Sequence, residues 1–160
     1  MRSPSKSNNE HLDFLLKSAG QMIDSLIEGL DLVDGETRKR IMQRCGESCA
    51  REKFFGPALE IAKRIGEEED DLDKILERAN EEILWCGKWE RKDHMILCRC
   101  CRCECPLVEI NVVKLTKTFC YCSLGWIKSI FETLFERPVR VDLETAIGFG
   151  DRECRFVIHI

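Results

Sequence analysis

Apolar residues recur at a helical spacing through the first half of the chain. From Glu10 to Leu30, leucine, isoleucine, methionine and alanine return every three or four residues, which predicts one long amphipathic helix. The turn that follows contains Asp34, which is suited to cap a second helix predicted over 36–52. Residues 1–9 are polar and lack this spacing, so we expect a disordered tail there.

Two shorter helices complete this half of the chain. The spacing predicts them over 58–65 and from 72 to about 85. The acidic run 67–71 between them is interpreted as a solvated loop, because acidic side chains favour the positive end of the next helix. Residues 10–85 are therefore a helical segment, and 86–160 form the α+β, ligand- or metal-binding segment of one compact domain.

In the second half, the pattern changes to alternation between apolar and polar residues. It predicts a strand over 89–105, a second strand over 106–117, and then a helix with Ser123 as its N-cap. Two further alternating runs, 139–145 and 154–160, predict a closing antiparallel hairpin. The expected fold is α+β, with an N-terminal helical layer packed on a mostly antiparallel sheet of order ββαββ.

The composition is that of one globular domain. The chain has 160 residues, 44 % apolar and 34 % charged, with a net charge of -4. No face is basic enough for nucleic acid, and no apolar run approaches the ~18 residues of a membrane span. The N-terminus lacks the apolar region of a secretory signal, so we expect a cytoplasmic protein that binds neither nucleic acid nor membrane.

Cysteine is the unusual residue of this chain. There are eleven, an odd number, and seven of them lie between Leu97 and Gly125. Cytoplasmic thiols stay reduced, so such clusters more often bind metal or carry redox chemistry than form disulfides. Free cysteine also packs as a small apolar residue, and about half of the eleven are expected to be inert. We interpret the cluster as a soft-metal site around which the other elements fold.

Spacing indicates which thiols can meet. Cys101, Cys103 and Cys105 would share one face of the predicted strand, because strand side chains alternate with a period of two. Cys120 and Cys122 repeat this spacing further along the chain. The same arrangement of two thiols on one face is expected there.

The second predicted helix carries Cys45 and Cys49 one turn apart. Their β-carbons would lie ~6 Å apart on one face, which suits two ligands of one metal. A disulfide needs β-carbons at ~4 Å, so it is not expected. Taken alone, the pair fits two core residues equally well.

Zinc is the favoured metal, because structural zinc takes four thiolate or imidazole ligands. The three histidines, His11, His94 and His159, have no partner at a ligand spacing, so sulfur is expected to dominate. More than four thiols are candidates, which leaves spare cysteines, two metals or a cluster open. An iron–sulfur cluster ranks second, because its usual sequence runs are of the C-x-x-C type. The candidate ligands are Cys45, Cys49, Cys103, Cys105, Cys120, Cys122 and Cys154.

The last quarter of the chain carries a phrase with known relatives. Residues 150–156 read Gly-Asp-Arg-Glu-Cys-Arg-Phe, after an aromatic-rich helix and a Pro-Val-Arg-Val strand. Residues 119–160 resemble the 4-vinyl reductase-type small-ligand domain and the L-2-amino-thiazoline-4-carboxylic acid hydrolase-like family. The whole chain is similar to uncharacterised cysteine-rich bacterial and archaeal proteins that share the phrase T-F-C-x-C-S-x-G-W.

The resemblance to the small-ligand domain implies a structural zinc held by cysteines and a glutamate. Cys154 and Glu144 match two of these ligands, and Cys120 or Cys122 matches a third. Ile147 stands where that family has a further cysteine and cannot ligate. The resemblance also implies an apolar ligand pocket, although ordinary core packing is the alternative for each aromatic residue. The candidate pocket residues are Trp126, Phe131, Phe135, Phe149 and Phe156.

Three functions are compatible with these features. The first is a metal-binding domain with a small-ligand or sensor role, whose partner is a small apolar or sulfur-containing ligand. The second is an enzyme, either a hydrolase or a thiol or iron–sulfur redox protein. It would need an open metal position or a thiol of low pKa, with Cys49 and Cys122 as candidates near helix ends. The third is a protein–protein adaptor that uses the helical layer. A homodimer is compatible with each of them.

Overall fold

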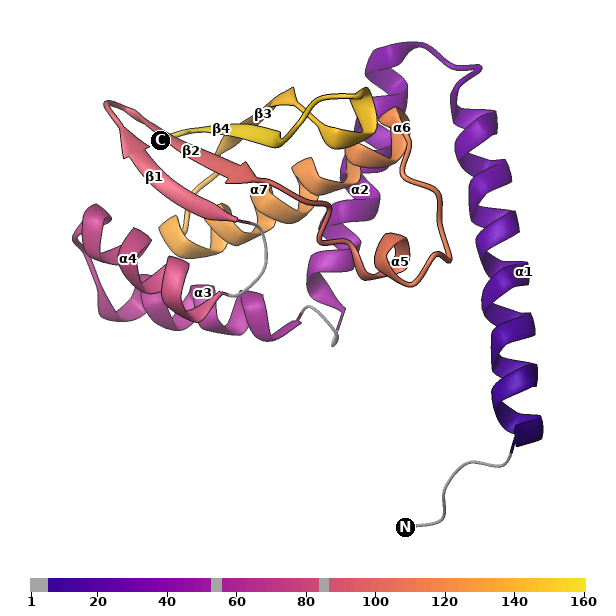
Figure 1. Ribbon diagram of the computed structural model, residues 1–160. Helices are drawn as coiled ribbons and strands as arrows, with labels where there is room; N and C mark the ends of the chain where they lie inside the picture. The colour runs from indigo at the N-terminus through magenta and orange to yellow at the C-terminus, as the bar shows by residue number, and fades with distance from the viewer. Residues whose placement is uncertain (1–5, 53–55, 84–86) are drawn as a thin grey trace.

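The computed structural model describes residues 6–52, 56–83 and 87–160 (Figure 1). Residues 1–5 of the predicted tail, and the end of the helix predicted to reach residue 85, lie outside these ranges. The described chain runs through a row of N-terminal helices and then into an antiparallel sheet. The predicted α+β class with an N-terminal helical region is therefore confirmed.

The helical spacing of the first half forms four helices near the predicted places, but the first begins at Lys6, so residues 6–9 of the predicted tail are helical. The Asp34 carboxylate caps the second of them by accepting the backbone N–H of Thr37 at 2.9 Å. Asp71 caps the fourth by accepting the backbone N–H of Asp73 at 3.0 Å. Gly66 does not end the third helix as a C-cap would, because it packs instead against the backbone of Leu134. The helices are α1 (Lys6–Leu30), α2 (Gly35–Arg51), α3 (Gly56–Glu68) and α4 (Leu72–Glu82).

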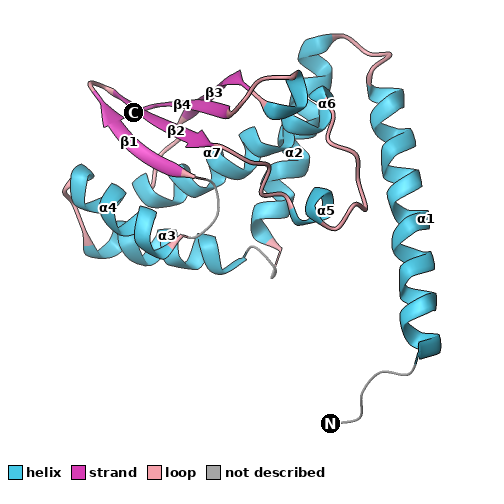
Figure 2. Cartoon of the chain, viewed as in Figure 1, coloured by secondary structure: helices cyan, strands magenta, loops and turns pink. Residues whose placement is uncertain are grey.

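The strands of the described residues form one four-stranded sheet in which every pairing is antiparallel. The order across the sheet is β1-β2-β4-β3, so the last strand of the chain lies inside the sheet (Figure 2). The last two strands form the hairpin that their alternation predicts. The strands are β1 (Lys88–Lys92), β2 (Met95–Cys100), β3 (Arg140–Thr145) and β4 (Cys154–His159).

The predicted order ββαββ is not matched. The stretch predicted as a single strand, 89–105, contains β2 and all of β1 except its first residue. Asp93 lies in the turn between these two strands, with a φ of 55°. The predicted strand 106–117 contains the short helix α5 (Pro106–Glu109), because a proline lacks an N–H and suits the first helical turn. A second short helix, α6 (Lys117–Cys120), follows it.

Helix α7 (Cys122–Phe135) is the centre of the core. It contacts α2 and α3 on one side and β3 on the other, so the helical layer and the sheet meet across it (Figures 1 and 2). Phe131 is fully buried on this helix, with its ring 5.0 Å from that of Trp89 and 5.8 Å from that of Phe135. Ser123 lies inside α7 and does not cap it, because the helix begins one residue earlier.

Two glycines allow α2 and α7 to approach backbone to backbone. A β-carbon on Gly46 would collide with the carbonyl oxygen of Cys122, and one on Gly125 would collide with that of Gln43. No other residue type fits at such a contact. The consequence for the site is that Cys49, one turn after Gly46, is held beside the start of α7.

Helix α1 runs along the side of the molecule and is only partly covered (Figure 1). Ile27 is buried at 4 % exposure, and Asp24 accepts the backbone N–H of Lys114 at 3.1 Å. The other side of the apolar stripe is open, with Leu15 and Met22 exposed by 48 % and 63 %. None of the described helices is long and apolar enough to cross a membrane. The homodimer stays a prediction.

Candidate metal-binding site

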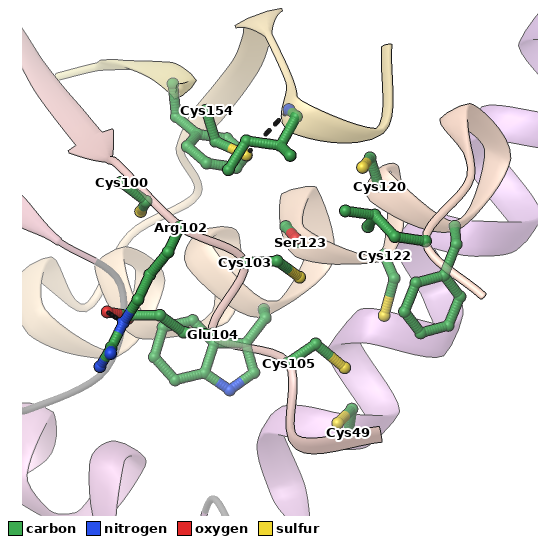
Figure 3. A pocket seen from close by; sticks show the side chains of 15 residues that line it. Cys49, Cys100, Arg102, Cys103, Glu104, Cys105, Cys120, Cys122, Ser123 and Cys154 are labelled. Carbon is green, nitrogen blue, oxygen red and sulfur yellow. Dashed lines mark hydrogen bonds and ion pairs between the residues drawn. The ribbon is translucent and has the colours of Figure 1, made fainter. Parts of the chain in front are cut away.

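Seven of the ten cysteines that the structure describes line one cavity of about 110 Å³ (Figure 3). They come from α2, the end of β2 and the segment after it, the end of α6, the start of α7 and the start of β4. Leu115, Phe119, Trp126, Ile147 and Phe156 complete much of the apolar wall. The lining cysteines are Cys49, Cys100, Cys103, Cys105, Cys120, Cys122 and Cys154.

The cavity unites six of the seven predicted ligands. Cys45 is the exception, because it is exposed on α2 and does not line the cavity, although it lies one turn from Cys49. Cys100 is a lining residue that was not among the predicted ligands. Its signal in the sequence is its place in the same cysteine run as Cys103 and Cys105.

The prediction that Cys101, Cys103 and Cys105 share one face of a strand is wrong, because β2 ends at Cys100 and the alternation of side chains ends with it. Cys101 is exposed, whereas Cys103 and Cys105 reach the cavity from irregular backbone. Within β2, Cys98 and Cys100 do share the buried face, with their sulfur atoms 3.9 Å apart. Cys98 accepts the indole N–H of Trp89 at 3.1 Å and stays in the core.

Cys120 and Cys122 also line the cavity from helices, and not from one face of a strand as predicted. Cys120 is the last residue of α6, and Cys122 is the first residue of α7. The two helices are joined at Tyr121, which is the cap of both. Both sulfur atoms therefore reach the cavity wall from a break between helices (Figure 3).

Backbone N–H groups point at several of the sulfur atoms. The N–H of Ile147 lies 3.5 Å from the sulfur of Cys154. The N–H groups of Gly148 and Cys105 likewise donate to the thiols of Cys120 and Cys103. Such hydrogen bonds favour the thiolate, which is the form that binds metal.

Burial nevertheless keeps the thiols protonated. Burial, together with the smaller effect of the neighbouring thiols, raises the pKa of Cys120 to about 12. Burial first, and the neighbouring thiols second, also raise the pKa of Cys49 and Cys122. The pKa values of Cys103 and Cys154 are raised mainly by burial. These are the opposite of the low pKa that a reactive-thiol enzyme needs.

The raised pKa of Cys120 makes the stability of the metal-free protein depend on pH. In the unfolded chain this thiol ionises near its ordinary value of 9.0, whereas in the folded protein it ionises at about 12. Stability is complete below pH 9 and is lost as the pH rises toward 12, by about 1.4 kcal/mol per pH unit for one such thiol. Urea unfolding of reduced, metal-free protein at pH 7.5 and 10 measures the loss.

The matched control for this prediction is Cys120→Ala, which cannot ionise at that position. Other lysines and thiols titrate equally in both proteins, so the variant should lose less stability between the two pH values than the wild type does. An identical loss in the two proteins would contradict the assignment to Cys120.

The other candidate ligands lie away from the cavity. Glu144 on β3 is exposed, 3.9 Å from the guanidinium of Arg155. His159 contacts Asp142 at 2.8 Å, and His11 and His94 are exposed. Across the described ranges, no three histidine, cysteine, aspartate or glutamate side chains are already arranged to hold a metal ion.

The aromatic candidates for a ligand pocket divide in the same way. Trp126 and Phe156 line the cavity. Phe131 and Phe135 pack in the core, and Phe149 stacks edge-on against Tyr121 at 5.6 Å. At the rim, Arg102 and Glu104 approach each other at 3.6 Å. This polar pair was not among the sequence candidates, since charged neighbours within a cysteine run carry no distinct signal.

The fold and the cavity define an α+β protein with a cysteine-lined interior site. The chain belongs to the family of unknown function DUF6144, whose model matches residues 20–160. No curated protein matches it. Among solved structures it is similar to the phenol-responsive sensory domain of the transcription activator PoxR with phenol, at 14 % identity and a TM-score of 0.52. That match covers 90 % of this chain and 73 % of the other, and it establishes a similar fold.

Proposed function

We propose that the cavity binds a soft metal ion, zinc in preference, through cysteine thiolates. The observation that carries the proposal is the convergence of seven thiols from six parts of the chain on one small, largely apolar space. Thiolates are strong ligands for zinc, and histidine is absent from the lining of this cavity in the described chain. An iron–sulfur cluster is the alternative that the same donor set admits.

The metal would stabilise the fold by joining its two layers. Cys49 belongs to the helical layer, Cys154 belongs to the sheet, and Cys122 starts the helix between them. Each thiol must lose its proton to bind, and the backbone N–H groups at Cys120 and Cys154 would then stabilise the negative sulfur. Affinity for the metal should consequently fall as the pH falls.

A small-ligand or sensor role is the second part of the proposal. It is supported by the fold shared with a phenol-responsive sensory domain, and by Trp126 and Phe156 in the cavity wall. The resemblance of residues 119–160 to the 4-vinyl reductase-type domain points in the same direction. An apolar cavity of about 150 Å³ accommodates benzene. The 110 Å³ found here therefore limits an apolar or sulfur-containing ligand to a few non-hydrogen atoms.

Elemental analysis tests the metal. Protein purified from medium without added metal should retain at least about one equivalent of zinc and be colourless. An iron–sulfur cluster would instead make the protein brown, with visible absorbance. A Cys101→Ser variant, altered at an exposed thiol outside the cavity, should retain the same amount. Less than about a tenth of an equivalent of any metal, with no uptake from added zinc, would contradict the proposal.

A further inference from the structure

Helix α1 carries two rows of apolar residues, and the rest of the chain packs against only one of them. In this inner row Ile27 is buried, Ile23 and Leu30 pack in the same cluster, and Gly20 lies against the backbone of Val112. The outer row runs one residue ahead of it and is exposed, its leucines and its methionine by 48 % to 64 %. The outer row is Leu12, Leu15, Ala19, Met22 and Leu26.

The outer row has the spacing of a helix that packs along a second helix. Its members are three, four, three and four residues apart, which is the a/d repeat of a coiled coil. The row is about 21 Å long, and none of its members is charged. The small, uncharged Ser18 and Ser25 lie beside it, so two chains with a net charge of -4 can meet here without facing like charges.

The first turns of α1 extend beyond the other elements of the molecule (Figure 1). In this part of the helix Leu12 and Phe14 are exposed by 53 % and 65 %. Contiguous exposed apolar surface of this kind marks an interaction site. A partner must therefore cover the end of the helix that the chain itself leaves uncovered.

An antiparallel pair of α1 helices makes the outer row complementary to itself. With a two-fold axis beside Gly20 and Gln21, Ala19 meets the partner's Met22, and Leu15 meets the partner's Leu26. Each layer then joins either two leucines or a small alanine with a long methionine, so the layers fill similar volumes. A parallel pair would instead place alanine on alanine and leave a void between the helices.

We propose that α1 binds a second copy of this chain, with the two helices antiparallel and in contact along the outer row. The inner row attaches each body to the C-terminal part of its helix, so the antiparallel pair holds the two bodies at opposite ends. Each copy covers the exposed first turns of the other helix. The contact does not involve the cysteine-lined cavity, so it is independent of metal binding.

Sedimentation equilibrium of the reduced full-length protein tests the dimer directly, because a reducing agent excludes copies joined by disulfides. We expect a mass approaching twice the 18.6 kDa of one chain over a series of about 1 to 100 µM, the range of moderate affinities. The mass of a single chain throughout this series would overturn the proposal and leave the outer row to a different protein.

Charge substitutions on the outer row test how the copies meet. Leu15→Glu and Leu26→Lys should each give a monomer, because each places an unpaired charge in the contact. The two substitutions together should restore the dimer, since each glutamate then meets a lysine of the other copy. Within one helix these positions are about 16 Å apart and cannot pair. Gln21→Glu is the matched control, because it adds the same charge as Leu15→Glu at an exposed position off the row and should remain dimeric.

Two further results would overturn the proposal. A dimer that persists in Leu15→Glu would place the interface elsewhere. A double variant that stays monomeric would contradict the antiparallel arrangement, because in a parallel pair equivalent positions meet and like charges would still face each other. Leu15 and Leu26 are both exposed in the single chain, so circular dichroism should show each variant folded. Where a variant does not fold, the mass of the wild type still decides.

Discussion

Zinc is expected to raise the melting temperature of the metal-free protein by about 8 to 16 °C. A ligand present at 1,000 times its dissociation constant stabilises the folded state by about 4 kcal/mol. In a domain of this size, each kcal/mol shifts the melting temperature by about 2 to 4 °C. The effect is large here because the ion would join α2, α7 and β4, which are distant from one another in the sequence. Thermal unfolding followed by circular dichroism, with and without a chelator, measures the shift.

Magnesium is the matched control for this experiment, because it prefers oxygen ligands and should leave the melting temperature unchanged. Cys101→Ser should show the full zinc shift, whereas Cys122→Ser should show a smaller one. Equal melting temperatures with zinc and with chelator would show that the thiols do not join the layers through a metal.

Replacing Gly46 by alanine is expected to destabilise the protein by about 1 to 3 kcal/mol, the usual cost of overpacking a close contact. The new β-carbon would meet the carbonyl oxygen of Cys122, so α2 must move away from α7. That movement also carries Cys49 away from Cys122, so zinc affinity should fall in the same variant. Urea unfolding of the metal-free protein measures the first effect, and competition with a chelator measures the second.

Gly29→Ala, at a position of α1 without such a contact, is expected to give the opposite result. A β-carbon at Gly29 has nothing within 4 Å, so alanine should stabilise α1 by up to about 1 kcal/mol through its higher helix propensity. If Gly46→Ala were as stable as the wild type or more stable, α2 and α7 would not be in backbone contact at Gly46.

Local physics explains which elements were predictable. The helices of the first half follow from apolar residues at a spacing of three and four, and Asp34 caps α2 because its carboxylate reaches an N–H three residues on. The alternation over β3 and β4 is equally local. The failure at 106–117 is also a local one, since Pro106 begins a helical turn and Asn111 has a φ of 56°, which interrupts a strand.

The sequence predicts the preference of this chain for a soft metal, whereas long-range contacts decide where the thiols lie. Residue type alone favours a soft metal, because the chain has eleven cysteines and only three histidines, none of which has a partner at a ligand spacing. The glycine contact with α7 decides which part of α2 meets the cavity, so that Cys49 is in the lining and Cys45, one turn earlier, is outside it. Cys98 and Cys100 share a strand face, yet Cys98 accepts the indole N–H of Trp89 in the core and Cys100 lines the cavity.

Sequence by itself determined the four N-terminal helices, the closing hairpin and sulfur as the ligand atom for any bound ion. Tertiary structure alone decided that Cys100 stands opposite Cys154, that Glu144 faces away, and that seven thiols line one cavity. The reason is physical, since periodicity and capping act within a few residues. The register of β2 on β4 and the approach of α2 to α7 join residues more than fifty positions apart.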